Sequence, residues 1–374
     1  MRIGIPAETR AGEQRVAGTP ETVKKMLAGG YHRILLQSGA GAAASMPDSE
    51  YQAAGATIVA GAQELYRSSE IVLKVRGPDA DELTQIKEST ILIGLLNPYN
   101  KEGIDALAQR GVTAFALEAL PRITRAQSMD VLSSQANIGG YKAVLVAADH
   151  YRKMFPMMMT AAGTVKAARV IVMGVGVAGL QAIATAKRLG AVVEATDVRP
   201  ETKEQVESLG AKFIEVPLTE AEKEIAKGAG GYAREMGEDY KKRQAALTAE
   251  RIKQADIVVT TALIPGRPAP VLVTEDMVKT MKPGSVIIDM AAEQGGNCPL
   301  TEKDQVVVKH GVILVGYTNF PARVPADASA LYARNVLNFF DLLVDKKNGT
   351  LNLNREDEII AGTLMCINGE VVRK

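Results

Sequence analysis

The sequence predicts an α/β protein made of two units, each built on a parallel sheet. Three observations lead to this prediction. The chain has 374 residues, which exceeds the usual length of a single domain. Short apolar runs alternate with amphipathic stretches of helical length, and this alternation starts again after a long helical pattern near residue 150. Strands that alternate with helices in this way form βαβ units, whose strands are parallel.

The first unit is expected to contain residues 1–135 together with residues 308–374. Its expected strands are residues 2–6, 33–37, 56–59, 71–75, 91–96 and 112–117. Its expected helices are residues 20–28, 62–68 and 102–110. Near the end of the chain, residues 328–344 have the periodicity of an amphipathic helix, which we expect to pack back on this unit.

The second unit is expected to span residues 136–307 and to begin with a helix at about residues 136–155. Its expected strands are residues 169–173, 192–195, 212–215, 257–260 and 285–289, with a further strand at 312–315 beyond that boundary. Residues 220–254 are highly charged and longer than an ordinary connection between strands. They predict a mobile loop followed by a solvated helix.

Charge and composition exclude several kinds of partner. The 44 basic and 43 acidic residues give a formal charge of +1, so nothing electrostatic favours nucleic acid or an anionic membrane. Two cysteines, Cys298 and Cys366, cannot form a disulfide framework, which favours a reducing compartment. The apolar run 170–186 is broken by glycines and is shorter than a membrane span, and the N-terminus does not resemble a signal peptide. We therefore expect no direct membrane insertion.

A glycine-rich turn follows the first strand of the second unit. Gly174, Gly176 and Gly179 match the pattern G-x-G-x-x-G between a strand and a helix, and Asp197 ends the next strand about 20 residues later. In this dinucleotide-binding fingerprint the three glycines permit a tight turn, close approach of the backbone to the pyrophosphate, and helix–strand packing. The N-terminus of the helix offers free N–H groups to the phosphates.

The acidic residue predicts which dinucleotide binds. Asp197 would accept hydrogen bonds from the adenosine ribose hydroxyls and repel a 2′-phosphate, so NAD(H) is favoured over NADP(H). Arg199 weakens this preference, because an arginine can accommodate a 2′-phosphate. The alternative is a glycine-rich turn that binds no ligand, and the complete strand–turn–helix–acid context argues against it. The sequence thus predicts two Rossmann-like domains with the cofactor in the cleft between them.

A polar loop follows the last strand of the first unit. Arg122, Gln127, Asp130 and Ser133 lie near the carboxyl end of that strand, where open α/β sheets bind ligands. Spacing alone leaves two interpretations open. The loop is either a portion of a binding site or a surface connection in which Arg122 and Asp130 form an ion pair.

Five segments of the chain closely resemble one family. They are residues 121–140, 155–163, 174–190, 260–270 and 295–299. The resemblance is to the NAD(H)-binding component, domain I, of proton-translocating nicotinamide nucleotide transhydrogenase. It extends over essentially the whole chain, and the loop with Arg122, Gln127 and Asp130 is highly specific to that family. The chain resembles the split form, in which domain I is a separate alpha-subunit polypeptide.

The resemblance implies a function, cofactors and partners. Hydride would pass directly between NADH on this chain and NADP+ on a partner domain, coupled to proton translocation by a membrane domain. NADP(H) would bind only to the partner domain, and no metal or general base would be needed. The chain would be cytoplasmic and peripheral to the inner face of the cell membrane. It would form a homodimer by exchanging a Met-rich hairpin at about residues 154–164, although a hairpin within one chain is the alternative.

The resemblance also implies roles for individual residues. Arg122 would lie against the dinucleotide, tied by charge to Asp130. Gln127 would contact the ribose of the nicotinamide half and bridge toward the partner's nucleotide, and Ser133 would help to seat the carboxamide. The other expected cofactor contacts are Ile123 and Thr124 in the polar loop, Gly174, Val175, Gly176, Val177 and Gly179 at the pyrophosphate, Asp197, Val198 and Arg199 at the adenosine ribose, Gly231 and Tyr232 in a closing loop, and Leu263 on the adenine side.

Two other functions are alternatives. Alanine dehydrogenase shares the fold, and Arg15 and Lys74 match its pyruvate-binding residues. However, Asn97 replaces its catalytic histidine and Glu293 its active-site aspartate, and an asparagine cannot act as an acid or base near pH 7. The second alternative is an NAD-responsive binding module without catalysis. Assays with and without an NADP-binding partner would separate it from the transhydrogenase component.

Overall fold

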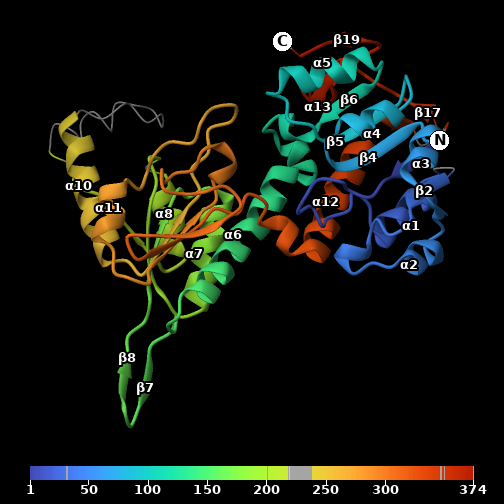
Figure 1. Ribbon diagram of the computed structural model, residues 1–374. Coiled ribbons are helices and arrows are strands. Elements are labelled where there is room, and N and C mark those ends of the chain that lie inside the picture. The colour runs from blue at the N-terminus through green and yellow to red at the C-terminus, as the bar shows by residue number, and fades with distance from the viewer. Residues whose placement is uncertain are drawn as a thin grey trace. The chain divides into compact units, whose positions relative to one another are not determined.

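The computed structural model describes residues 1–30, 33–199, 201–217, 219, 238–345, 348 and 350–373. These residues form two compact units (Figure 1). Unit 1 comprises Met1–Gln135 and Pro321–Lys374, and unit 2 comprises Ala136–Phe320. Each unit has its own mostly parallel sheet with hydrophobic clusters on both faces. The predicted fold class, two Rossmann-like domains, is confirmed.

Unit 1 is built on one large sheet. Its strands are β1 (Arg2–Ile5), β2 (Arg33–Gln37), β3 (Thr57–Val59), β4 (Ile71–Arg76), β5 (Ile91–Leu95), β6 (Thr113–Ala116), β18 (Leu364–Ile367) and β19 (Glu370–Val371), with a separate pair β16 (Val344–Asp345) and β17 (Thr350–Leu351). Its helices are α1 (Pro20–Ala28), α2 (Asp48–Ala53), α3 (Ala62–Ser68), α4 (Ala80–Gln85), α5 (Lys101–Gln109), α12 (Pro325–Phe340) and α13 (Glu358–Thr363). The strand order in the large sheet is β19-β18-β6-β5-β4-β1-β2-β3. Strands β1 to β6 pair in parallel, whereas β18 joins β6 antiparallel.

Local sequence explains why these elements form. Helix α1 begins as predicted because Thr19 caps it, forming a capping box with Thr22, and Pro20 occupies its first turn. Along β4, Leu73 lies in the same buried cluster as residues of α12, while Val72 lies in the cluster on the opposite face. This alternation is the period-2 pattern of a strand that is covered on both faces. Helix α12 confirms that the C-terminal amphipathic segment packs back on unit 1.

Unit 2 repeats the architecture. Its sheet strands are β9 (Arg169–Met173), β10 (Val192–Thr196), β11 (Lys212–Phe213), β12 (Ile257–Thr260), β13 (Val286–Asp289), β14 (Val306–Lys309) and β15 (Val312–Val315). Its helices are α6 (Val131–His150), which begins in unit 1, α7 (Val177–Arg188), α8 (Thr202–Ser208), α10 (Glu238–Gln254) and α11 (Glu275–Thr280). The strand order is β11-β10-β9-β12-β13-β15-β14, and only the β14–β15 pair is antiparallel among the described strands of this sheet.

Two boundaries differ from those expected. The compact units divide between residues 320 and 321, and not at 307, because β15 pairs in parallel with β13 and brings β14 with it into the second sheet. Helix α6 begins at Val131 and not at 136, because Asp130 binds the backbone N–H of Ser133 and so caps the first turn. Of the expected segment 220–254, residues 220–237 lie outside the described residues, and α10 confirms the helix that follows.

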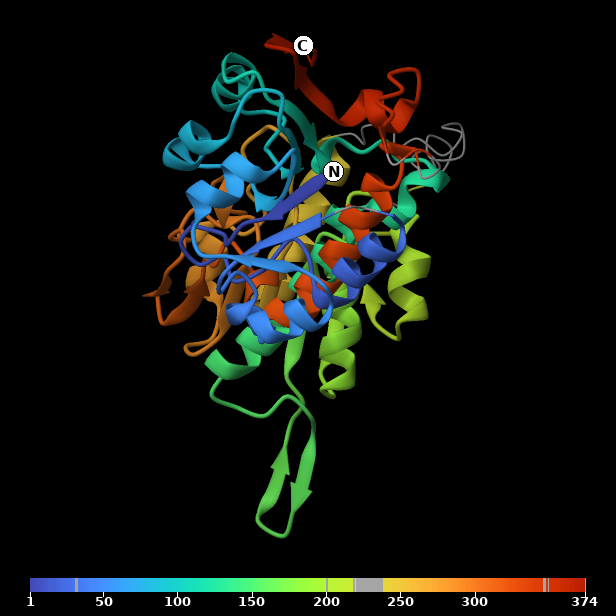
Figure 2. The same cartoon turned by 90° about the vertical axis from the view of Figure 1, so that its right-hand side faces the viewer.

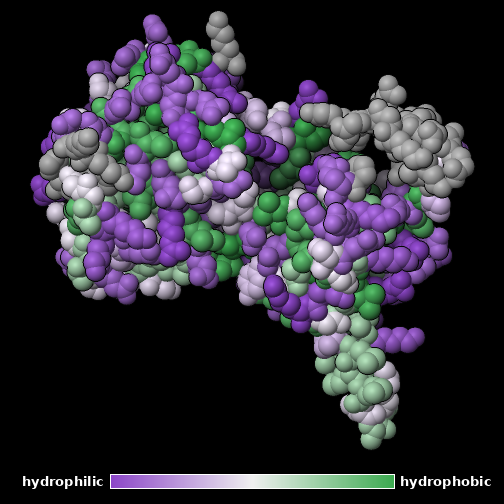
Figure 3. All heavy atoms as spheres, turned by 180° about the vertical axis from the view of Figure 1, so that it is seen from behind, coloured by the Kyte–Doolittle hydropathy of each residue, from purple (hydrophilic) through white to green (hydrophobic). Residues whose placement is uncertain are grey.

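A two-stranded hairpin, β7 (Met158–Thr160) and β8 (Gly163–Val165), extends away from the sheet of unit 2 (Figures 1 and 2). The side chains of Met157 and Met159 are 60% and 72% exposed. In Figure 3 the hairpin stands out as a pale green, apolar projection. The hairpin is therefore formed as predicted, but its methionines do not fill a core within this chain.

The apolar run 170–186 is a strand, a turn and a helix: it comprises most of β9, the glycine turn and most of α7. In β9 its apolar side chains alternate between the clusters on the two faces of the second sheet, as in a buried parallel strand. Across the described ranges of the chain, no helix has both the length and the apolar character needed to cross a bilayer.

Candidate functional site

The turn after β9 has the geometry of a dinucleotide-binding loop. Gly174 has a φ of +95°, a conformation that glycine adopts without strain. A Cβ on Gly179 would lie 2.0 Å from the carbonyl oxygen of Gly174, so only glycine lets α7 start this close to the strand. A Cβ on Gly176 would meet nothing within 4 Å, and Gly176 caps α7 without a side-chain hydrogen bond. The first turn of α7 therefore presents its N–H groups on an open face, which suits a phosphate.

Asp197 lies directly beside this turn. One of its carboxylate oxygens accepts a hydrogen bond of 2.6 Å from the backbone N–H of Val175. Arg199 donates to the same carboxylate from its backbone N–H at 2.9 Å and from Nε and Nη2 at 2.9 and 3.0 Å. Burial opposes the ionisation of Asp197, but the hydrogen bonds from Arg199 and Val175 outweigh it and lower the pKa. The carboxylate of Asp197 is thus charged and fixed in position. A ribose bound here would either share this carboxylate with Arg199 or displace the Arg199 side chain from it.

Leu263 lies on the segment after β12, at the same edge of the sheet. Thr261, two residues before Leu263, donates from Oγ1 to the carbonyl oxygen of Gly174 at 2.9 Å. Leu263 and Ile264 are 48% and 44% exposed. Strands β10, β9 and β12 are neighbours, so the structure brings Asp197, the glycine turn and this segment together at their carboxyl ends. Ligands of open α/β sheets bind at this edge.

The polar loop of unit 1 is a short helix, η3 (Thr124–Met129), with the preceding Arg122 and Ile123. Its backbone is fastened at two points. Arg125 forms a bidentate ion pair with Asp357, and the side-chain amides of Asn335 and Asn338 on α12 donate to the carbonyl oxygen of Ser128 at 2.8 and 2.9 Å. The loop is thus held in place while the expected site residues Arg122, Thr124 and Gln127 point their side chains to solvent and Ile123 is half-buried.

Asp130 is hydrogen-bonded to Ser133. Its two carboxylate oxygens accept hydrogen bonds from the backbone N–H and the hydroxyl of Ser133, at 2.9 and 2.5 Å. No ion pair joins it to Arg122 among the described residues. Asp130 is the N-cap of α6, a position that favours aspartate for the hydrogen bonds it makes there, and Ser133 lies in the first turn of that helix and not in the loop.

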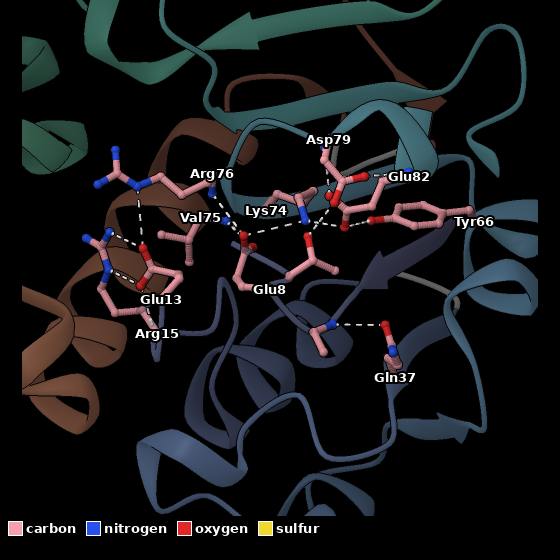
Figure 4. Close-up of polar contacts among 12 residues, drawn as sticks. Glu8, Glu13, Arg15, Gln37, Tyr66, Lys74, Val75, Arg76, Asp79 and Glu82 are labelled. Atoms are coloured by element: carbon pink, nitrogen blue, oxygen red, sulfur yellow. Dashed lines mark hydrogen bonds and ion pairs between the residues drawn. The ribbon is translucent and has the colours of Figure 1, made fainter. Parts of the chain in front are cut away.

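Arg15 and Lys74, the residues shared with alanine dehydrogenase, belong to a buried ionic cluster (Figure 4). The Nζ of Lys74 lies 2.7 Å from Glu82 and 3.5 Å from Glu8, and Arg15 forms two hydrogen bonds of 2.7 Å with Glu13. Burial raises the pKa of Glu8, against the opposing effect of Lys74. Both cations are therefore paired within unit 1, which supports their interpretation as structural residues.

Asn97 stabilises a turn. It has a φ of +55°, its side-chain oxygen accepts a hydrogen bond from the N–H of Tyr99, and its own N–H donates to Glu118 at 2.8 Å. Asparagine tolerates this left-handed conformation better than most residues. Nothing in the geometry gives the Asn97 side chain an acid–base role.

Gly231 and Tyr232 lie outside the described residues, and Val198 is 91% exposed beside Asp197. No local pattern in the sequence indicates the ion pair of Arg125 with Asp357. Their separation in the sequence carries no local signal, so only the fold could bring them together.

A glycine turn, an acidic residue fixed beside it and an open helix N-terminus, all at the carboxyl ends of a doubly wound sheet, define a dinucleotide-binding α/β protein. The comparisons with known proteins narrow this class. Residues 4–139 match the family model "Alanine dehydrogenase/PNT, N-terminal domain", and residues 143–374 match "Alanine dehydrogenase/PNT, C-terminal domain". The chain therefore belongs to the alanine dehydrogenase/PNT family.

Similar proteins of this family fall into two groups. The chain is 55% identical to a Rhodospirillum rubrum protein named as the first portion of NAD(P) transhydrogenase subunit alpha, over 100% of this chain and 98% of that protein. It is 45% identical to the NAD(P) transhydrogenase subunit alpha of Cereibacter sphaeroides, over 99% of this chain and 71% of that protein. Alanine dehydrogenase 2 of Staphylococcus aureus is 32% identical, over 92% of this chain and 88% of that protein.

A solved structure, the transhydrogenase from Sinorhizobium meliloti, matches with a TM-score of 0.90 at 49% identity and covers 99% of this chain and 100% of that chain. The resemblance to transhydrogenase that the sequence motifs indicated is confirmed.

Proposed function

We propose that this chain is the NAD(H)-binding component of a proton-translocating transhydrogenase. One observation carries the proposal: the glycine turn and the fixed carboxylate of Asp197 occur in a chain that matches the Rhodospirillum rubrum alpha-subunit polypeptide along its full length. The chain spans nearly all of that polypeptide but only 71% of the longer alpha subunit of Cereibacter sphaeroides. The name subunit alpha, which both relatives carry, supports a chain that acts together with other subunits.

The residues at the carboxyl edge of the second sheet fit NAD(H). The backbone at Val175, Gly176 and Val177 would hold the pyrophosphate, because Gly176 has no side chain in the way and the first turn of α7 has no side-chain cap. Asp197 would accept hydrogen bonds from the adenosine ribose, and Leu263 would cover the adenine side. Gly174 and Gly179 contribute only the turn and the close helix–strand contact.

When bound, NADH supplies a hydride to NADP+ held on a partner domain, so this chain has no proton to abstract. Its residues therefore act by positioning and by exclusion of water. In our proposal, Gln127 binds the ribose of the nicotinamide half and aligns it toward the partner's nucleotide. Arg122, Ile123 and Thr124 lie against the dinucleotide, and Ser133, with its hydroxyl oriented by Asp130, seats the carboxamide.

The assembly belongs to the same proposal. Coupling to proton movement requires a separate membrane subunit, with this chain in the cytoplasm at the inner face of the membrane. The exposed Met-rich hairpin supports a homodimer, because its apolar side chains would be covered by a second copy. Sedimentation at micromolar concentration tests this point: a dimer supports the exchanged hairpin, and a monomer contradicts it.

Alanine dehydrogenase is the competing function within the family. It is disfavoured by Asn97, which stabilises a turn and cannot transfer a proton, and by the pairing of Lys74 with Glu82 and Glu8. The proposed function predicts no reduction of NAD+ that depends on alanine.

The deciding experiment titrates the chain with NADH and then adds a partner domain loaded with NADP+. We expect NADH binding and partner-dependent formation of NADPH. Binding without transfer would favour an NAD-responsive module, and turnover with alanine, or with pyruvate and ammonia, would favour alanine dehydrogenase.

A further inference from the structure

Asn297 closes a loop with its side-chain amide. It is completely buried. Its Oδ1 accepts a hydrogen bond from the N–H of Ala262 at 3.1 Å, and its Nδ2 donates to the carbonyl oxygens of Ala262 and Pro270 at 2.9 and 2.8 Å. Ala262 and Pro270 are the two ends of the segment 262–270, which we call the β12 loop. One amide thus fastens both ends of the loop, and neither of its N–H donors remains for a ligand.

The backbone of Asn297 is held just as firmly. Its N–H donates to one carboxylate oxygen of Asp289 at 3.1 Å, and the N–H of Cys298 donates to the other at 3.0 Å. Gly296 makes this possible: its φ is +81°, and a Cβ there would lie 2.7 Å from the Asp289 carboxylate. Asp289 ends β13, so Asn297 is anchored to a central strand of the sheet. Through its side-chain hydrogen bonds, Asn297 in turn holds the β12 loop in a fixed position relative to that strand.

The β12 loop begins beside the glycine turn. The N–H of Thr261 donates to the carbonyl oxygen of Met173 at 2.9 Å, and its Oγ1 donates to that of Gly174 at 2.9 Å. Leu263 and Ile264 follow at once and are exposed at the edge where we place NAD(H). Any displacement of Ala262 would therefore displace these two side chains relative to the glycine turn.

A second tether acts on the same loop. In the orientation that satisfies its hydrogen-bond partners, the amide of Gln294 donates to the carbonyl oxygens of Ile264 and Arg267 at 3.2 and 3.1 Å. The N–H of Ala269 donates to the carbonyl oxygen of Gln294 at 2.8 Å. Gln294 is half-buried, so its replacement disturbs the core less than replacement of Asn297.

We propose that Asn297 is a positioning residue for NAD(H): it fixes the β12 loop so that Leu263 and Ile264 form one wall of the nucleotide site. This inference rests on the proposed function for the identity of the ligand. Asn297 acts through the β12 loop and not by contact with the nucleotide, because its side chain is buried and its amide forms hydrogen bonds within the chain. If the β12 loop adopts its binding position for only a fraction of the time, the apparent Kd for NADH is the intrinsic Kd divided by that fraction.

The test compares Asn297→Ala with a matched control in the same sheet. Asp256 is also buried, and its carboxylate accepts from the N–H of Arg169 at 2.9 Å and from Lys282 at 3.1 Å, but it precedes β12 and so lies at the opposite, amino edge. Asp256→Ala thus removes a comparable tether away from the proposed site. For each variant we would measure the midpoint of thermal unfolding and the Kd for NADH by fluorescence titration.

We expect Asn297→Ala to raise the Kd for NADH roughly tenfold and Asp256→Ala to change it less than about twofold, although both lower the unfolding midpoint. With an NADP+-loaded partner domain, the KM for NADH should rise with Kd while the rate at saturating NADH stays within about twofold. An unchanged Kd in Asn297→Ala, or an equal change in the control, would overturn the inference and leave Asn297 a purely structural residue.

Gln294→Ala keeps the test decisive if Asn297→Ala does not fold. We expect it to raise the Kd for NADH about threefold with little change in the unfolding midpoint, and an unchanged Kd would count against the inference. Failure of the wild-type chain to bind NADH would contradict the proposed function itself. Normal binding by the wild type together with an unchanged Kd in both variants would contradict only the role of Asn297.

Discussion

Arg125 donates two hydrogen bonds to Asp357, from Nη1 at 2.7 Å and from Nη2 at 2.9 Å. Asp357 in turn caps α13 by accepting from the N–H of Ile359 at 2.8 Å. The ion pair therefore joins the short helix that carries Gln127 to a helix near the end of the chain. A bidentate arginine–carboxylate pair fixes orientation as well as distance, which a single contact cannot do.

We predict that Arg125→Ala lowers the rate of hydride transfer about three- to tenfold and leaves the Kd for NADH unchanged within about twofold. The substitution removes one of the contacts that hold the short helix carrying Gln127, while the glycine turn and Asp197 are unchanged. Single-turnover transfer and NADH titration measure the two effects. Arg334→Ala is the control, because it breaks an exposed ion pair with Glu21 in the same unit, at 2.7 Å. Equal rates in the two variants would show that the Arg125 pair does not position the loop.

The same ion pair predicts a dependence of stability on pH. The hydrogen bonds from Arg125 are the main cause that lowers the pKa of Asp357 below its ordinary value of 3.8. A lowered pKa in the folded state contributes stability that is present above pH 3.8 and is lost as the pH falls through the folded-state value. The unfolding midpoints of wild type and Arg125→Ala should therefore differ at pH 7 and converge below pH 3.8. A constant difference across that range would contradict this linkage.

Asp197 should decide the choice between the two reduced nucleotides. We predict that the wild-type chain binds NADH at least about tenfold more tightly than NADPH, and that Asp197→Asn narrows this ratio by roughly tenfold. The substitution removes the charge that repels a 2′-phosphate and releases Arg199 to pair with it. Fluorescence titration with both nucleotides measures the ratio, and an unchanged ratio in the variant would place the source of selectivity elsewhere.

Lys74 should matter for stability and not for catalysis. Its removal leaves Glu8 and Glu82 buried without their cation, so Lys74→Ala should lower the free energy of unfolding by about 3–5 kcal/mol. Lys25→Ala breaks an exposed pair with Glu21 at the same distance of 2.7 Å and should cost about 0.5 kcal/mol or less. Denaturant unfolding of both variants provides the comparison. Costs of similar size would refute the structural role of the buried cluster.

The sequence predicted those features of the fold that depend on local patterns. Alternation of apolar runs located the strands β9, β10 and β12, and the helix expected at residues 20–28 is α1. The fingerprint predicted that Asp197 lies at the same site as the glycine turn, because strand, turn, helix and next strand follow one another in the chain. Such local patterns are good predictors because, in natural proteins, the local structural preferences of the sequence are consistent with the tertiary packing.

The features that could not be predicted depend on contacts between distant residues. The pair Arg125–Asp357, the amide of Asn297 between Ala262 and Pro270, and the membership of β15 in the second sheet all need the finished topology. Asp130 illustrates a different reason. From its spacing, Asp130 suited a binding loop or an ion pair with Arg122, whereas in the structure its carboxylate caps α6 through its hydrogen bonds with Ser133.

The most direct test of the proposed function is single-turnover hydride transfer from NADH on this chain to NADP+ on a partner domain, with wild type and Gln127→Asn compared. Asparagine keeps the amide but shortens the side chain, so the nicotinamide should be positioned less well. We predict partner-dependent transfer in the wild type, a rate about ten- to a hundredfold lower in the variant, and a change in the Kd for NADH of less than about threefold. No transfer from the wild-type chain, or the same rate in both proteins, would contradict the account.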